Sequence, residues 1–393
     1  MTRQPQINQN LLDTGTPPIP EARSWLDAYE GRHGPGIDLS QAVPGYPPPP
    51  ELLGWLAEAA RDPAAAQYGA INGDEELRRA YARHAGAVYG AEIDASQVMI
   101  TAGCNQAFVT VSMAVAKAGE AILLRTPWYF NHAMTLGMLG IEALPLAARG
   151  EDGFVPDPKA AERLIDNRTR AIALVTPNNP TGAIYPPETI AAFARLCAGR
   201  GLWLIIDETY RDFLPDSAAR PPHALLADKT LQGRVIQLYS FSKSYCVPGH
   251  RIGAVIAAEA FLCELAKVQD CVQICAPRVG QMALARAIPA LGAWREANRA
   301  LIGRRARAFK EAMAEVNRWQ VGSLGGYFAY LRHPFSGQSS ASIAQRLARN
   351  YGLLVLPGSY FGPGQEGYLR VAFANVDERQ IRDFARRLRS VEA

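Results

Sequence analysis

The sequence predicts an α/β protein with a large domain, in which a mostly parallel sheet lies between helices, and a smaller α+β domain. Short apolar runs alternate with helix-length amphipathic segments through the middle of the chain, a spacing typical of parallel βαβ units covered on both faces. The texture changes near residue 290, where a long helical pattern begins. With 393 residues, 48% of them hydrophobic, the chain can build a sizeable core but is long for a single domain.

Residues 1–49 are rich in Pro and Gly and poor in periodicity, so we expect an N-terminal arm and a segment of the smaller domain. The large domain is predicted over residues 50–290. Its helical patterns include 51–61, 74–89 and 186–200. Its strands are predicted from apolar runs at 98–100, 121–124, 171–175, 202–206, 235–238 and 254–257.

The C-terminal part, residues 291–393, is predicted to form the smaller domain. An Arg- and Ala-rich helical stretch covers 293–316, and a final amphipathic helix covers 378–391. Shorter strand candidates lie between these helices, at 327–331, 353–356 and 369–373.

Charge and composition exclude several classes of function. The chain has 41 Lys and Arg against 37 Asp and Glu, and a formal charge of +4 argues against a nucleic-acid surface or a polybasic membrane patch. No apolar run reaches the length of about 18 residues that a membrane span needs. The first ten residues lack the pattern of a signal peptide. The six scattered cysteines have no metal-ligand spacing, so we predict free thiols in a reducing cytoplasm and no metal site.

One lysine stands in an unusual context. Only six of the 41 basic residues are lysines, and Lys243 follows the predicted strand 235–238 between small hydroxyl residues, eight positions before Arg251. Partial burial and a nearby fixed cation both lower a lysine pKa from its ordinary value of about 10.4, and the neutral amine can form a Schiff base with a carbonyl. The competing interpretation is a solvated surface lysine.

Polar motifs follow the other predicted strands, where open α/β sheets bind their ligands. Asp207 is either a helix N-cap or the partner of a cationic ring nitrogen. Asn179 lies in a Pro- and Asn-rich run that forms a turn and could hydrogen-bond a phenolate oxygen. Residues 101–106 open a helix whose N–H groups could bind phosphate. Tyr129 is either a core residue or a platform for a planar ligand. Together these motifs describe a phosphorylated pyridine-type aldehyde.

The sequence resembles the class I/II pyridoxal-phosphate-dependent aminotransferases, which are fold-type-I PLP enzymes. The resemblance runs from about residue 40 to residue 389 and implies a mixed, mostly parallel sheet in the large domain. Its most specific motifs are Asn179-Pro180-Thr181-Gly182, Asp207-Glu208-Thr209-Tyr210, Ser240-Phe241-Ser242-Lys243 and Gly249-His250-Arg251-Ile252-Gly253.

The resemblance implies a role for each residue around the cofactor ring. Lys243 would carry pyridoxal 5'-phosphate as a Schiff base and then move the substrate proton. Asp207 would pair with the pyridinium nitrogen, which keeps the ring a good electron sink. Asn179 and Tyr210 would hydrogen-bond the ring oxygen, and Tyr129 would stack on the ring.

The phosphate and the substrate have their own implied partners. The phosphate would be held by Ser240, Ser242, Arg251 and the backbone of Gly103, Cys104 and Asn105. Tyr68, in a Tyr-x4-Gly pattern, would reach the phosphate across a dimer interface, which implies a homodimer with shared active sites. Arg370 would bind the substrate α-carboxylate, with Asn179 and Ala42 beside it; the alternative for Arg370 is a surface arginine on a strand.

Two residues depart from the family pattern: Ala42, in a loop that helps to set substrate choice, and Thr176, at a supporting position. Ala42 stands where a glycine normally lets backbone approach the substrate, and Thr176 stands where the family often has Asn. We expect an aromatic or bulky neutral amino donor, because several aromatic side chains could form the pocket, namely Trp128, Tyr46, Phe241 and Tyr360. The alternative is that these aromatic residues only pack the core. Arg278 could meet an acidic side chain or lie at the interface.

The resemblance implies ping-pong transfer of an amino group between an amino acid and a 2-oxo acid. The alternative is another fold-type-I reaction on the same cofactor, such as β-elimination at a C–S bond. A non-catalytic regulator with this fold is disfavoured, because only about 45 irregular residues precede the fold and the net charge is small.

Overall fold

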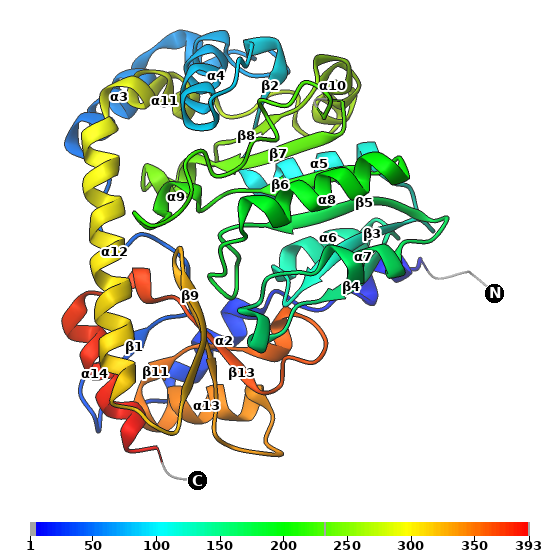
Figure 1. Ribbon diagram of the computed structural model, residues 1–393. Coiled ribbons are helices and arrows are strands. Elements are labelled where there is room, and N and C mark those ends of the chain that lie inside the picture. The colour runs from blue at the N-terminus through cyan, green and yellow to red at the C-terminus, as the bar shows by residue number, and fades with distance from the viewer. Residues whose placement is uncertain (1–4, 232, 392–393) are drawn as a thin grey trace.

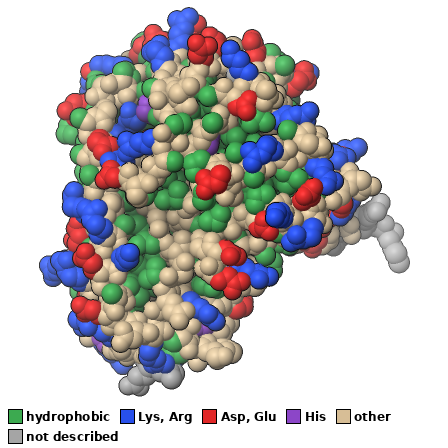
Figure 2. All heavy atoms as spheres, viewed as in Figure 1, with side chains coloured by type: hydrophobic (Ala, Val, Ile, Leu, Met, Phe, Trp, Pro, Cys, Tyr) green, Lys and Arg blue, Asp and Glu red, His purple; other side chains and the backbone are tan. Residues whose placement is uncertain are grey.

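The computed structural model describes residues 5–231 and 233–391 (Figure 1). The outermost residues of the predicted arm and of the C-terminal domain, 1–4 and 392–393, lie outside the described part. The chain forms an α/β structure, as expected, and its described residues build one large sheet and two small sheets. Figure 2 shows basic and acidic side chains interspersed over the visible face, in keeping with the small net charge.

The large sheet has seven strands in the order β2-β8-β7-β6-β5-β3-β4. β8 runs antiparallel to both of its neighbours, while the pairs from β7 to β4 are parallel. The sheet is therefore mixed and mostly parallel. Its strands are β2 Val98–Thr101, β3 Ala121–Thr126, β4 Glu142–Ala147, β5 Thr169–Val175, β6 Trp203–Asp207, β7 Val235–Ser240 and β8 Gly253–Ile256.

Helices cover both faces of this sheet (Figure 1). Side chains alternate across each strand, so that in β6 Ile205 packs into one buried cluster with α5, while Leu204 and Ile206 pack into the other with α8. Burial on both faces explains why the sequences of the central strands are mostly apolar. The helices of this part are α3 Pro50–Arg61, α4 Glu75–Tyr89, α5 Cys104–Val115, α6 Phe130–Met138, α7 Pro158–Leu164, α8 Pro187–Arg200, α9 Phe241–Ser244, α10 Glu259–Gln273 and α11 Arg278–Ala290.

The smaller part is built on an antiparallel sheet in the order β12-β13-β10-β9 and a parallel pair, β1 and β11. The long helix α12 runs alongside both parts (Figure 1). The domain limits 50–290 and 291–393 stay a proposal that this arrangement supports. Its elements are α2 Pro18–Asp27, β1 Ile37–Asp38, α12 Gly292–Ala314, β9 Gln320–Gly325, β10 Phe328–Arg332, α13 Ser340–Tyr351, β11 Leu353–Leu354, β12 Leu356–Pro357, β13 Tyr368–Val371 and α14 Glu378–Arg389. The short helix α1 Gln9–Leu12 packs instead against α6 of the large part.

Several elements differ from expectation, and the strands β1 and β9, for example, were not predicted. The arm contains the ten-residue helix α2, which begins at a proline and buries Trp25. β4 lies at the edge of the large sheet with mostly exposed or half-exposed side chains, and its apolar sequence is interrupted by Pro145, which is untypical of a strand interior. The apolar run 353–356 is split between two sheets, because β11 pairs with β1 and β12 pairs with β13. Among the described residues, no helix is both long and apolar enough to cross a membrane.

Candidate active site

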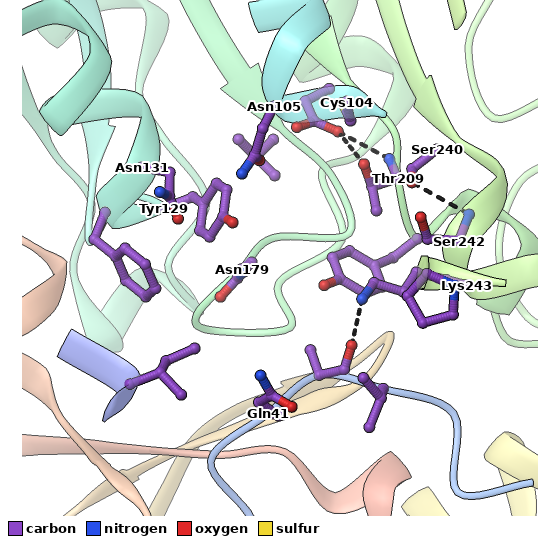
Figure 3. Close-up of a pocket in the computed structure, with 18 of the residues that line it drawn as sticks. Gln41, Cys104, Asn105, Tyr129, Asn131, Asn179, Thr209, Ser240, Ser242 and Lys243 are labelled. Atoms are coloured by element: carbon purple, nitrogen blue, oxygen red, sulfur yellow. Dashed lines mark hydrogen bonds between the residues drawn. The ribbon is translucent and has the colours of Figure 1, made fainter. Parts of the chain in front are cut away.

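A cavity of about 510 Å³ lies at the carboxyl ends of the central parallel strands, where open α/β sheets bind ligands. All the predicted site residues except Tyr68 and Gly103 line it. Figure 3 shows Lys243, Asn179 and Tyr129 around the same space, although they come from distant parts of the chain. The predicted residues that line it are Ala42, Cys104, Asn105, Tyr129, Asn179, Asp207, Tyr210, Ser240, Ser242, Lys243, Arg251 and Arg370.

Lys243 lies on the single-turn helix α9, directly after β7. Its Nζ donates a hydrogen bond to the backbone carbonyl of Ala42, which is drawn as a dashed line in Figure 3. Burial lowers the pKa of Lys243 to about 8, and the Arg251 and Arg370 guanidinium groups act in the same direction. The amine is therefore much easier to deprotonate than an ordinary lysine, as a nucleophile requires.

Asp207 ends β6 with its carboxylate buried beside the cavity. Its Oδ1 accepts hydrogen bonds from the Thr209 backbone N–H, at 3.0 Å, and from the Thr209 hydroxyl, at 2.7 Å. Its Oδ2 lies 3.5 Å from Nε2 of the buried His132. Burial by itself raises the pKa of Asp207, but His132 and Thr209 outweigh burial and lower it. The aspartate is thus held as an anion, suited to pairing with a cationic ring nitrogen.

Two phenols and a guanidinium enclose the middle of the cavity. Burial raises the pKa of Tyr129 to about 12 and raises that of Tyr210 well above its ordinary value, so both hydroxyls stay protonated donors. Arg370 is fully buried on β13; its Nη1 donates to Asn179 Oδ1, at 3.0 Å, and its Nη2 donates to the Ser40 carbonyl. The Nε of Arg370 has no hydrogen-bond partner among the described residues, which leaves a donor for an anion.

The opposite end of the cavity gathers hydroxyls and a second guanidinium. Ser242 Oγ is buried without a hydrogen-bond partner in the described part of the chain, and Ser240 Oγ accepts the Ser242 N–H at 3.3 Å. Gly103 does not line the cavity but lies against Arg251, whose guanidinium would collide with any Cβ placed there. The twelve-residue helix α5 begins beside these groups, and the N–H groups of its first turn are further donors. The hydroxyls, the guanidinium and the N–H groups together fit a phosphate group.

Sequence reasoning missed the arginine that supports the Asn179 loop. Arg125 is buried in β3, and its Nη1 donates to the Pro127 carbonyl and to Asn178 Oδ1, both at 2.7 Å. Its Nη2 donates to the Phe154 carbonyl and to Thr181 Oγ1. A lone arginine inside an apolar strand gave no motif to find. His132 was missed although it lies only three residues after Tyr129, because a lone histidine in the first turn of a helix resembles an ordinary core histidine.

The substrate end of the cavity differs from the expected aromatic pocket. Trp128, Tyr46, Phe241 and Tyr360 do not line it. Phe241, for instance, is buried against Tyr81 and Tyr239. Instead, the start of α2 and other segments contribute side chains that were not expected there, namely Pro17, Pro18, Ile19, Gln41, Val43, Phe130 and Asn131.

Two predicted residues lie away from the cavity of their own chain. Tyr68 has 80% of its surface exposed. Arg278 pairs with Asp74, with 3.2 Å between Nε and Oδ1, and donates to the Ala64 carbonyl. Its guanidinium is therefore already engaged by groups of this chain.

Comparison with known proteins agrees with this geometry. The family described as aminotransferase class I and II matches residues 35–388. The chain is 30% identical over 392 residues to an aromatic aminotransferase, ISS1, of Arabidopsis thaliana, covering 98% of this chain and 95% of that protein. It is 31% identical over 328 residues to the arginine–pyruvate transaminase AruH of Pseudomonas aeruginosa, covering 82% and 81%.

Solved structures of similar fold cover nearly the whole chain. A methionine aminotransferase of Escherichia coli, YbdL, superposes with a TM-score of 0.88 at 25% identity, covering 99% of this chain and 100% of that one. A Thermus thermophilus aspartate aminotransferase variant gives a TM-score of 0.90 at 22% identity, covering 98% and 99%, which bears on the fold alone. The protein belongs to the class I and II aminotransferases and is a transaminase.

Proposed function

We propose that this transaminase binds pyridoxal 5'-phosphate in the cavity, covalently through Lys243, and moves an amino group between an amino acid and a 2-oxo acid. The observation that carries the proposal is the lowered pKa of Lys243, to about 8, between two guanidinium groups whose positions suit two anions. A phosphate would lie at Arg251 and a carboxylate at Arg370. One lysine between two such anion sites matches a cofactor and a substrate that each carry one anion.

The residues around Lys243 fit the ring of that cofactor. Asp207, held as an anion by His132 and Thr209, would face the ring nitrogen and keep a proton on it. Tyr210 and Asn179 would hydrogen-bond the ring oxygen, and Tyr129 would cover a ring face. Bound there, the cofactor supplies an electron sink for the pair left behind when the substrate Cα loses its proton.

The phosphate end is supported by unsatisfied donors. Ser242 Oγ is buried with no partner among the described residues, and Ser240 caps the same turn. Arg251 would add the charge, and the N–H groups of Gly103, Cys104 and Asn105 begin α5 beside it. A buried polar atom without a partner is costly, so a bound phosphate would relieve the cost at Ser242.

The chain's own groups would carry the remaining steps. Lys243, released when the substrate amine takes its place, would move the proton from the substrate Cα. Arg370 would hold the α-carboxylate through donors such as its Nε. Lys243 is half-buried, and the burial of Asp207 and Arg370 beside it would limit the access of water to the reacting atoms.

We further propose an aromatic or bulky neutral amino donor. The side-chain end of the cavity carries Pro18, Ile19 and Phe130, and both lining arginines already have proposed anions. Two relatives are named as aromatic aminotransferases, although others are named for aspartate. Ile19→Lys, which adds a cation at the apolar end, should shift the preference toward aspartate. A wild-type chain for which aspartate is by far the best donor would contradict this proposal.

A homodimer with shared sites and a cytoplasmic location also belong to the proposal. The exposed ring of Tyr68 suits a residue that reaches a second copy, and all six cysteines are unpaired. Tyr68→Phe should weaken binding of the cofactor by several-fold, because one hydrogen bond to phosphate is lost.

The central experiment uses Lys243→Ala with a panel of amino donors and with 2-oxoglutarate and pyruvate as acceptors. We expect wild-type protein to bind the cofactor covalently and to form the pyridoxamine form with donor alone. The variant should keep the fold by circular dichroism and lose both properties. Full turnover by the variant would refute the assignment, and release of ammonia and pyruvate from a cysteine-type donor would favour a C–S β-lyase.

A further inference from the structure

A chain of buried polar contacts links the long helix α12 to the turn that carries Lys243. Tyr239 on β7 donates its hydroxyl proton to Asp212 Oδ2 at 2.7 Å, and its oxygen lies 2.6 Å from Ser244 Oγ. Arg295, near the beginning of α12, has its Nη1 at 3.6 Å from Asp212 Oδ1. Ser244 is the residue directly after Lys243.

The direction of each hydrogen bond follows from the charge on Asp212. Burial by itself raises the pKa of Asp212, but Arg211 and Arg295 are among the neighbours that outweigh burial and lower it. An ionised carboxylate only accepts hydrogen bonds, so the single phenol proton of Tyr239 is committed to Asp212. Ser244 must then donate its own proton to the Tyr239 oxygen.

This contact fixes one end of a very short element. α9 has only four residues, and the Ser240 side chain already caps its N-terminal end by accepting the Ser242 N–H. Ser244, which is 2% exposed, is tied down at the C-terminal end. Lys243 therefore lies between two fixed residues, Ser240 and Ser244. Its backbone is held in place, while its side chain extends into the cavity.

We propose that Tyr239, oriented by Asp212, is a positioning residue that fixes the Lys243 turn through Ser244. The inference rests on the proposed role of Lys243. Tyr239 does not line the cavity and touches no reacting atom. Its hydroxyl acts by holding the reactive amine in register with the cofactor and the substrate.

Tyr239→Phe keeps the ring, which packs under the Arg211 guanidinium at 4.2 Å and against Tyr81, and removes only the hydroxyl. We expect the donor half-reaction of the holoenzyme to slow about tenfold, the factor set by one buried hydrogen bond, with donor affinity changed less than about twofold. The visible circular dichroism of the bound cofactor should weaken as well. Ser244→Ala should have the same effects.

Tyr81→Phe is the matched control. Tyr81 is buried beside Tyr239, and its hydroxyl has no hydrogen-bond partner among the described residues. We expect this variant to keep both the rate and the dichroism within about twofold of wild type. The double variant Tyr239→Phe/Ser244→Ala should be no slower than either single variant, because both lose one shared contact.

Three results would overturn the role of Tyr239. They are a Tyr239→Phe rate within about twofold of wild type, an equal loss in Tyr81→Phe, and losses that multiply in the double variant. The proposed function is judged separately, from covalent cofactor and amino transfer in the wild-type chain. If the wild type has both and Tyr239→Phe is unchanged, only this inference fails; a wild type without covalent cofactor would overturn both.

Discussion

His84 should make the stability of this protein depend on pH in a defined window. It lies on α4, and its Nε2 accepts a hydrogen bond from Arg295 Nη1 at 3.0 Å, which requires a neutral imidazole. Burial lowers the pKa of His84 from 6.5 to about 4, with Arg211 and Arg295 acting in the same direction. As pH falls below 6.5, the unfolded chain takes up a proton that the folded chain refuses. The free energy of unfolding therefore falls until the pH reaches about 4.

The size of this effect follows from the two pKa values. Between pH 7 and pH 5 the linkage removes about 1–2 kcal/mol from the free energy of unfolding. His84→Gln keeps an acceptor for Arg295 and removes the titrating ring. The free energy of unfolding, measured by urea unfolding at pH 7 and at pH 5, should therefore decrease less in the variant than in wild type. The difference between the two decreases should be about 1–2 kcal/mol. His33→Gln controls for the removal of a histidine elsewhere, and equal pH dependence in wild type and His84→Gln would refute the reasoning.

Three further changes have defined outcomes. Arg125→Met leaves its buried acceptors unpaired and should lower the free energy of unfolding, measured in urea, by about 3–5 kcal/mol. The control Arg200→Met, at an exposed arginine, should lower it by about 0.5 kcal/mol or less. A loss below about 1 kcal/mol for Arg125→Met would contradict its role. Gly182→Ala, at φ +76° and with its Cβ forced against the backbone of Gly325, should cost at least about 2 kcal/mol in the same assay. Asp207→Asn keeps the shape and loses the charge, so initial rates should fall about 100-fold with the fold unchanged by circular dichroism; a fall below about threefold would argue against its pairing with the ring nitrogen.

The central fold could be predicted because its strands are buried on both faces. Such strands are mostly apolar, so β3 and β5 stand out through the continuous apolar runs 121–124 and 171–175. β4 could not be found this way, since one edge of it faces solvent and Pro145 interrupts the pattern. The antiparallel direction of β8 could not be predicted either, because the apolar sequence of a buried strand does not indicate in which direction the strand runs in the sheet.

The candidate site was predictable where a polar residue directly follows a buried strand. Asp207 and Lys243 both stand at such points, and topology alone brings the ends of β6 and β7 together. Residues that arrive from other elements gave no such signal. Ile19 comes from a helix far away in sequence, and His132 and Arg125 act through contacts that only the folded chain creates.

The two arginines of the cavity have a second effect besides binding anions. Before any anion binds, Arg251 and Arg370 add to burial in lowering the pKa of Lys243 to about 8. At pH 7.5 about a quarter of the amine is then neutral, against about 0.1% for an ordinary lysine, which favours attack on an aldehyde. A phosphate at Arg251 and a carboxylate at Arg370 would cancel these charges. The amine would become more basic only once the substrate is in place, when its proposed task changes from attacking a carbonyl to accepting a proton.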